Sequence, residues 1–353
     1  MLPPLHARWT DALFGAPLPE EGRATCDDCA MQRPPGADAD DGALYFNEDR
    51  CCTYFPTLHN FLAGGVLAET SPETANGRAI LEAMVTARAG ITPLSVDAPA
   101  HYWTLYSTSS QLFGRKGSLR CPFLDVPTGR CGVWQHREST CSTWFCKHER
   151  GAVGGGFWKA LHQLFMVVEG AVALHCATEL QVGSEALAAL VTSRRQEPTG
   201  PELDGSVDHA RHRRHWGKWL GREREFFVQS APIAAALRWE AALALAGAEG
   251  TVLAQQARKA YARFTDVSPV LVPLRLGRFS VRGTAADAVQ LVTYRDYDPL
   301  PVTPAVFAAL GRFDGRPTAS VVAEMAAQGG PLLEPELLRR LVDHEILVPR
   351  VKS

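Results

Sequence analysis

The sequence predicts a mainly α protein with a loop-rich, cysteine-rich region at its front and a small α+β module of winged-helix type at its end. Three observations predict this. Cysteine and turn-forming residues are concentrated in residues 1–150, apolar residues recur with helical spacing in residues 151–265, and β-branched segments with short helical patterns fill residues 266–353. We therefore expect three parts: a cysteine-rich region, a helical bundle region and a winged-helix-like module.

The overall composition is that of an ordinary soluble protein. Its 353 residues carry a formal net charge of -2, which gives no general field for nucleic acid or for an anionic membrane. The two longest apolar stretches, residues 157–182 and 231–248, are interrupted by charged side chains, so we expect no membrane span. The first residues lack the basic and apolar segments of a secretory signal, which predicts a cytoplasmic protein.

Regular structure is sparse in the front region and frequent in the middle region. Residues 77–88 form the one clear helical pattern before residue 150, and the glycines of residues 151–156 are expected to form a hinge between domains. Four or five helices should follow. Their apolar stripes are Phe157, Leu161, Leu164, Phe165 and Val168; Ile233, Leu237, Ala241 and Leu245; and Val252, Ala257, Ala260 and Phe264.

The last part of the chain predicts a hairpin followed by three short helices and a strand. Residues 270–281 and 288–294 should pair around Gly283. The later signals are Thr303 with Pro304 at the first helix, Thr318 as the cap of a helix over residues 321–327, Pro335 at the start of a helix to residue 342, and a strand at residues 346–348.

Eight of the nine cysteines precede residue 147, while Cys176 lies in an apolar helical stretch where a lone buried thiol is usual. In a reducing compartment, thiols clustered on loop-like sequence point to metal ligands rather than disulfides. One structural site can contribute about 10 kcal/mol or more to the folding of a region so poor in helix. The predicted ligands are Cys26, Cys29, Cys51, Cys52, Cys121, Cys131, Cys141 and Cys146.

The cysteine spacing predicts more than one ion. Cys26-x2-Cys29 can bring two thiolates to one ion through a tight turn. The adjacent Cys51 and Cys52 point to opposite faces if extended, so they suit two ions or a cluster. Two sites of four thiolates would use all eight cysteines, and four sulfurs suit both zinc and an iron-sulfur cluster.

The segment from Cys121 to Cys146 resembles the second half of the YkgJ-type CxxCxxCC family, which is described as zinc- or iron-chelating. The matching residues are Cys121-Pro122-Phe123-Leu124, Cys131, Trp134, Arg137, Cys141 and Cys146. The chain departs from the family at Glu138, where Pro is usual, and in the long separation of Cys29 from Cys51. Flagellin lysine N-methylase has similar cysteines, so the resemblance also implies a protein methylation alternative.

The residues around these cysteines favour iron, as a cluster of the 4Fe-4S type, over zinc. Aromatic residues such as Trp134 and Trp144 can shield the site, and Arg137 can offset the negative charge of several thiolates. A purely structural metal is the main alternative. No hydrolytic zinc motif is present, and no catalytic base or nucleophile can be named, so whether the chain is an enzyme stays open.

Other polar groups gave weaker signals. His136 and His148 lie beside cysteines and could replace a thiolate, but we expect each to be outside the ligand shell. Residues 208–219 mix cations with indoles as nucleic-acid surfaces do. The acidic residues that follow favour a solvated helix face, so nucleic acid is not expected as a partner.

The C-terminal module resembles PqqD-like peptide-recognition domains. The resemblance rests on residues 302–307, the turn at residues 313–316, Thr318, Leu337-Leu-x-x-Leu341 and Ile346-Leu347. It implies a peptide or protein substrate that adds to an exposed strand, for which residues 270–281 are the candidate. The resulting hypothesis is a cluster-containing protein that modifies a bound peptide; the alternative is a non-enzymatic, metal-dependent regulator or scaffold.

Overall fold

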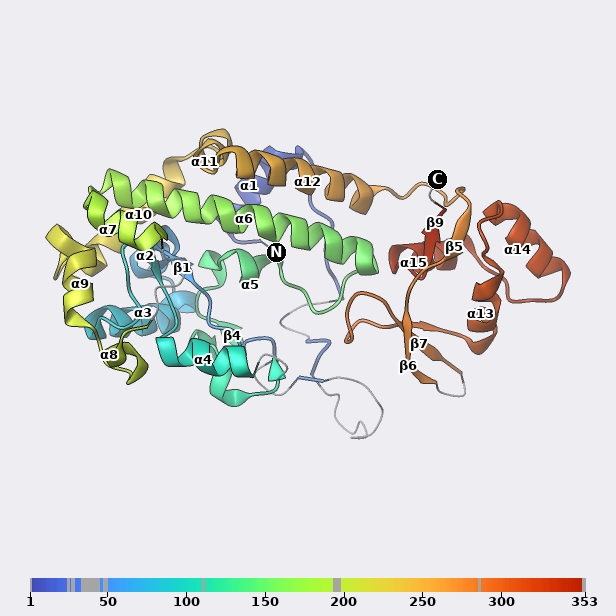
Figure 1. Cartoon of the computed structure of the whole chain (residues 1–353), viewed down its shortest axis with the longest axis horizontal. Helices are drawn as coiled ribbons and strands as arrows, with labels where there is room; N and C mark the ends of the chain where they lie inside the picture. Colours follow the sequence, from blue (N-terminus) through green and yellow to red (C-terminus); the bar gives the residue numbers. More distant parts are fainter. Residues whose placement is uncertain are drawn as a thin grey trace. The chain divides into compact units, whose positions relative to one another are not determined.

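The computed structural model describes residues 2–23, 26, 29–32, 45–46, 50–109, 112–192, 198–284 and 287–350. It is mainly α-helical, as the sequence predicts, and divides into two compact units (Figure 1). Unit 1 comprises Met1–Leu18, Phe46–Trp144 and Ala160–Arg258, and unit 2 comprises Pro19–Tyr45, Phe145–Lys159 and Lys259–Ser353. Each unit therefore combines segments that are far apart in the chain.

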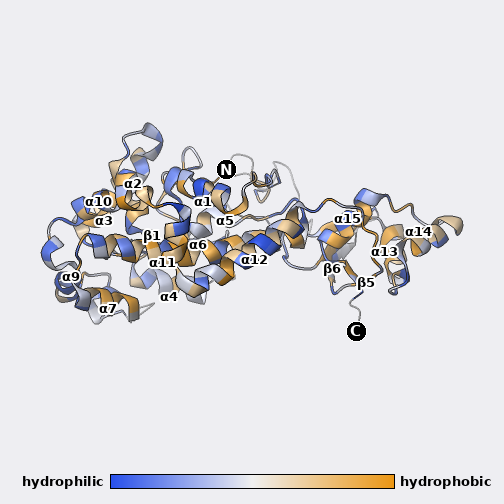
Figure 2. Cartoon of the chain, turned by 90° about the horizontal axis from the view of Figure 1, so that it is seen from above, coloured by the Kyte–Doolittle hydropathy of each residue, from blue (hydrophilic) through white to orange (hydrophobic). Residues whose placement is uncertain are grey.

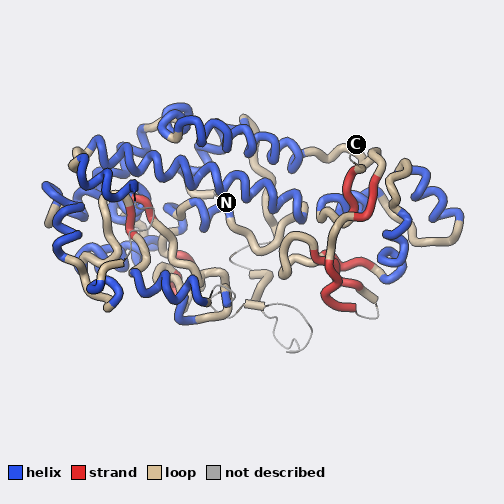
Figure 3. Tube along the Cα trace, in the orientation of Figure 1, coloured by secondary structure: helices blue, strands red, loops and turns tan. Residues whose placement is uncertain are grey.

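Unit 1 is built from helices with two very short antiparallel strand pairs, which appear in red in Figure 3. The strands are β1 (Leu58–His59) with β2 (Ser95–Val96), and β3 (Leu124–Asp125) with β4 (Arg130–Cys131). The helices are α1 (Pro4–Phe14), α2 (Asn60–Ala68), α3 (Ala75–Ala87), α4 (Ala100–Thr108), α5 (Ser139–Thr143), α6 (Gly151–Glu179, beginning in unit 2), α7 (Ser184–Thr192), α8 (Gly200–Leu203), α9 (His209–Trp216), α10 (Glu223–Ala236), α11 (Trp239–Leu245) and α12 (Gly247–Thr265, ending in unit 2).

The core of unit 1 is organised around the contact of α2 with α10. A Cβ atom at Gly64 of α2 would lie 1.8 Å from the carbonyl oxygen of Phe227, so glycine is what allows the two backbones to approach. Asn60, fully buried at the start of α2, donates hydrogen bonds of 2.9 Å to the carbonyls of Pro93 and Ala173. These contacts fix α2 against both the loop before β2 and α6.

The helical predictions were confirmed where the pattern was strong. The pattern at residues 77–88 is α3, and the first apolar stripe, Phe157 to Val168, is completely buried. Seven α-helices, α6 to α12, occupy the described part of the middle region instead of four or five. The second stripe was wrong, because the helix ends at Ala236 and a new helix starts at Trp239, and Leu245 is exposed. The third stripe lies on the single helix α12, where Ala257 and Phe264 are buried and only Val252 is exposed.

The expected glycine hinge was also wrong. Residues 151–156 form the first turns of α6. A Cβ atom at Gly154 would lie 3.0 Å from the Cβ atom of His148, and one at Gly155 would lie 2.9 Å from the ring of Tyr294. The glycines therefore allow close packing inside unit 2.

Helix α6 is long and apolar enough to cross a membrane by length and composition, and half of its apolar window is buried inside the structure. Glu169, near the middle of the helix, is 1% exposed. A core helix of a folded protein has the same composition. The hydropathy colouring in Figure 2 shows hydrophilic positions on the neighbouring α12, consistent with its exposed residues.

Unit 2 contains one sheet of order β6-β7-β8 and a separate pair, β5 with β9. The predicted hairpin is present only in part: β6 (Ser280–Thr284) pairs with β7 (Val289–Val292), but Gly283 lies within β6, and residues 274–276 of the expected first strand pair with β9 instead. Thr303 caps α13 by accepting the N–H of Val306, and Pro335 begins α15. Thr318 was assigned wrongly as a cap, because it lies within the helix and donates to the carbonyl of Val272. The elements are β5 (Leu274–Leu276), β6 (Ser280–Thr284), β7 (Val289–Val292), β8 (Leu300–Val302), α13 (Pro304–Ala309), α14 (Thr318–Ala327), α15 (Pro335–Asp343) and β9 (Leu347–Pro349).

Replacing Gly64 with alanine should destabilise unit 1 by at least about 2 kcal/mol, because the added methyl group meets a backbone carbonyl that cannot move aside. The matched control is Gly170→Ala in α6, where no atom lies within 4 Å of the added Cβ and the helix should gain stability. Denaturant unfolding followed by circular dichroism measures both changes. Equal stability of the two variants would contradict the close α2–α10 contact.

Candidate cysteine site

Four of the predicted ligands are neighbours in unit 1: Cys52, Cys121, Cys131 and Cys141. Burial raises the pKa of the Cys121 thiol well above its usual value, and negative charge on Cys131 and Cys52 raises it further. The pKa of Cys141 is raised well above its usual value by burial, by Glu138, and by the other three thiols. Cys121 belongs to one buried apolar cluster, and Cys52 and Cys131 pack against that same cluster.

Backbone hydrogen bonds bring the first three of these cysteines together. The N–H of Cys121 donates to the carbonyl of Cys52 at 2.8 Å. The β3–β4 pair places Leu124 opposite Cys131, so a tight turn returns Cys131 to the chain just after Cys121. The hydroxyl of Tyr102 accepts the N–H of Phe55 at 2.8 Å and lies 3.2 Å from the carbonyl of Leu119.

Cys141 is presented by the short helix α5, whose N-cap is Glu138. One carboxylate oxygen of Glu138 accepts the N–H of Cys141 at 2.9 Å, and the other accepts the N–H of Thr140 at 2.6 Å. Burial raises the pKa of Glu138 to about 7, and the charge of Glu169 contributes to the rise. Proline, which is usual at this position of the resembling family, could not accept these bonds.

The remaining cysteines are distributed over both units. In unit 2, burial raises the pKa of Cys146 to about 11, with the charge of Cys29 as the next cause, so these two thiols are neighbours. Cys26 is exposed in unit 2, and Cys51 is partly buried in unit 1. All nine cysteines lie in the described part of the chain, and none of them is joined in a disulfide. Cys176 is buried in α6, as expected for a lone core thiol.

The four thiols of unit 1 are not arranged as a complete metal-binding site. Among the described residues, no three His, Cys, Asp or Glu side chains stand together in a geometry that could hold a metal ion. The four sulfurs are electrostatic neighbours, and ligation of one ion would require their side chains to turn toward a common point.

An aromatic cluster that was not predicted as part of the site lies beside the four thiols. Tyr54, Tyr102, Trp103 and Tyr106 pack edge to face or stacked, with ring centroids 5.6 to 6.2 Å apart. Negative charge on Cys121 and Cys141 adds to the burial that raises the pKa of Tyr102. The one available signal was the run of aromatic residues in α4. As predicted, Arg137 lies close by, with its guanidinium 3.3 Å from the carbonyl of Cys141.

The two histidines beside the cysteines are engaged elsewhere. His136 pairs with Glu69 through Nε2 at 2.7 Å. His148 is buried in unit 2 with Nδ1 3.0 Å from the Tyr294 hydroxyl, and burial lowers its pKa to about 3. In the basic segment, Asp208 caps α9, and His212 pairs with Glu223 at 2.9 Å.

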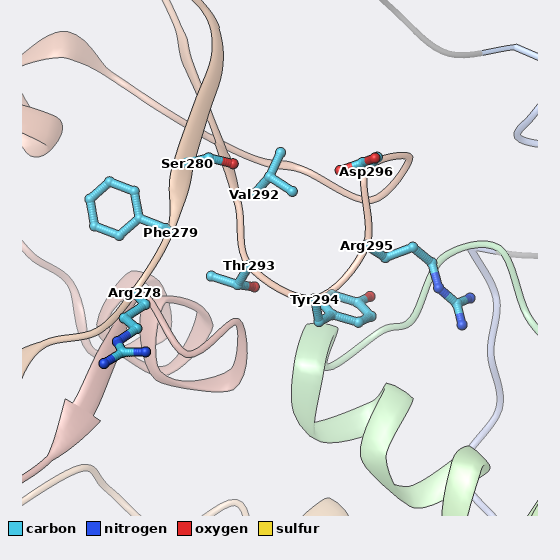
Figure 4. Close-up of a pocket in the computed structure, with 8 residues that line it drawn as sticks. All are labelled: Arg278, Phe279, Ser280, Val292, Thr293, Tyr294, Arg295 and Asp296. Carbon is cyan, nitrogen blue, oxygen red and sulfur yellow. The ribbon is translucent and has the colours of Figure 1, made fainter. Parts of the chain in front are cut away.

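A shallow hollow of about 440 Å³ lies at the ends of β6 and β7 (Figure 4). Phe279, Ser280, Val292 and Thr293 line it. The side chains of Arg278 and Arg295 point away from one another, so they do not converge on an anion.

No family model, curated protein or solved structure matches this chain. The YkgJ-type and PqqD-like resemblances therefore rest on the residues quoted for them.

A buried carboxyl group provides a pH test of unit 2. Glu21 accepts the N–H of Glu149 at 2.6 Å and the indole N–H of Trp158 at 2.7 Å, and burial raises its pKa to about 7. A carboxyl group whose pKa is raised on folding stabilises the fold at low pH. That stability decreases as the pH rises from about 4.5 through 7.

Between pH 5 and 8, the wild-type chain should therefore lose about 2 kcal/mol of unfolding free energy relative to Glu21→Gln, which cannot ionise. Glu20→Gln, at an exposed neighbour, is the matched control and should follow the wild type. Denaturant unfolding at a series of pH values measures the difference. Parallel pH profiles for wild type and Glu21→Gln would contradict the raised pKa.

Proposed function

We propose that the chain is a metal-binding protein in which Cys52, Cys121, Cys131 and Cys141 of unit 1 hold one metal centre. The proposal rests on the hydrogen bond of 2.8 Å from the N–H of Cys121 to the carbonyl of Cys52, and on the packing of Cys52 and Cys131 against the apolar cluster that contains Cys121. The contribution of the neighbouring thiols to the raised pKa values of Cys121 and Cys141 agrees with this arrangement.

The chemistry of this donor set suits zinc and a 4Fe-4S cluster equally, because both take four thiolates. Zinc would cross-link the loops of unit 1, whereas an iron-sulfur cluster would supply electron transfer. The aromatic cluster around Tyr102 and the guanidinium of Arg137 favour the cluster, since they exclude water and offset negative charge. We assign Cys29 and Cys146, with Cys26 and Cys51, to further metal binding.

Cys141→Ala and Cys121→Ala should each remove the metal centre of unit 1, because four-coordinate sites rarely survive the loss of a ligand. Cys176→Ala is the matched control, since it removes a buried thiol outside the site and should leave the metal content unchanged. Anaerobic purification, elemental analysis and visible spectroscopy measure the outcome. Equal metal content in all three variants and the wild type would contradict the proposal.

The same measurement separates the functional classes. Brown protein with iron and acid-labile sulfide supports redox modification of a peptide or protein, and leaves lysine methylation as a related alternative. Zinc alone in a colourless protein supports a metal-dependent regulator or scaffold.

A second candidate function is peptide recognition by the winged-helix-like module of unit 2. Strand β6 pairs only with β7 among the described residues, and its residues from Ser280 to Gly283 are exposed. Val281 is 45% exposed on this strand. An edge of this kind can accept an extended peptide as an additional strand.

Val281→Lys should weaken binding of a peptide encoded beside the gene for this chain at least tenfold, since a lysine on an edge strand opposes further pairing. Val252→Lys, at an exposed position of α12, is the control and should bind normally. Fluorescence anisotropy of the labelled peptide measures both affinities. Indistinguishable binding by the two variants would reject β6 as the docking edge.

A further inference from the structure

The N-terminal end of α5 is held by two buried carboxylates. The first backbone N–H groups of a helix have no partner inside the helix. In α5, Glu138 accepts the N–H groups of Thr140 and Cys141, and Glu169 of α6 accepts the N–H of Ser139 at 3.1 Å. Every one of these three donors thus binds a carboxylate, and Cys141 is one of them.

A histidine from the start of the chain completes the network. Nε2 of His6, on α1, lies 2.8 Å from the second oxygen of Glu169, and Nδ1 lies 2.9 Å from the hydroxyl of Ser142. His6 is completely buried and stacks on Phe165 with ring centroids 4.5 Å apart. The imidazole is therefore linked to α5 in two ways. It hydrogen-bonds Ser142 of α5 directly, and it hydrogen-bonds Glu169, which in turn accepts the N–H of Ser139.

Ser142, His6 and Glu169 have the composition of a hydrolase triad, but their surroundings oppose that role. Ser142 is 3% exposed, and its hydroxyl also donates to the carbonyl of Ser139 at 3.2 Å. A nucleophile must reach a substrate carbonyl, and this hydroxyl is enclosed by its own helix and by His6. The network is arranged to hold α5 in place.

We infer that His6 is a positioning residue for Cys141, so that α1 forms part of the metal centre without supplying a ligand. The inference rests on the proposed function of unit 1. The residues that orient a metal ligand commonly affect affinity about 10- to 100-fold. In this chain the orientation passes from the His6 ring through Ser142 and Glu169 to the backbone of α5.

The test uses Co²⁺ as a probe of the full-length chain after removal of bound metal. His6→Ala should bind Co²⁺ about 10- to 100-fold more weakly than the parent chain and show weaker sulfur-to-cobalt charge-transfer absorption. His6→Gln, whose amide N–H can still donate to Glu169, should recover part of both signals. Leu13→Ala is the matched control, because it removes another buried side chain of α1 outside the network and should bind Co²⁺ normally.

The outcomes are distinguishable. If the parent chain binds Co²⁺ and Cys141→Ala does not, but His6→Ala matches the parent in affinity and spectrum, the inference is overturned and the proposed function stands. If the parent chain binds no Co²⁺ through its cysteines, both are overturned. Should His6→Ala fail to fold, Ser142→Ala removes only the direct link, and unchanged binding by that variant overturns the inference as well.

Discussion

The architecture of unit 1 depends on finding hydrogen-bond partners for a backbone that has little regular structure. Buried N–H and C=O groups must be paired, and residues 112–144 contain, besides turns, only two 3-10 helices of three residues, two two-residue strands and α5. Side chains supply the missing partners. The hydroxyl of Tyr102 accepts the N–H of Phe55 and donates to the carbonyl of Leu119, just before Cys121. The hydroxyl of Thr53 accepts the N–H of Gly114 at 2.7 Å. The positions of the sulfurs follow from this pairing.

Local signals in the sequence predicted local structure well. The spacing of Ile80, Leu81, Met84 and Val85 identified α3, and Thr303 followed by Pro304 identified the start of α13, because each signal acts within one helical turn. Thr318 has the same capping chemistry, but its hydroxyl finds a distant carbonyl at Val272. The stripe through Ala241 and Leu245 failed because the chain breaks its helix at Leu237. A tertiary contact decided the case of Thr318.

The candidate site also shows that contacts between distant segments could not be predicted from local sequence signals. Its members could be named from the sequence, since the number and placement of the cysteines already indicated ligation. Which cysteines come together in space could not be predicted, because the hydrogen bond from the N–H of Cys121 to the carbonyl of Cys52 joins segments that are far apart in the sequence. The family resemblance covered Cys141 and Cys146 in one segment, whereas the two belong to different compact units. His6 gave no signal, since a histidine in a short first helix has no pattern that connects it to α5.

The charges around Cys141 explain why a cation suits this position better than a free thiolate. Burial, the carboxyl of Glu138 and the neighbouring sulfurs raise the pKa of Cys141. A cation bound there would reverse this balance, because it would stabilise the thiolate and would be attracted by the same negative groups. Glu138 therefore has two effects at once: it caps α5 through two N–H groups, and it makes the ionised sulfur depend on a positive partner. A proline at this position would supply neither effect, because it has no side-chain oxygen to accept the N–H groups of α5 and no negative charge beside Cys141.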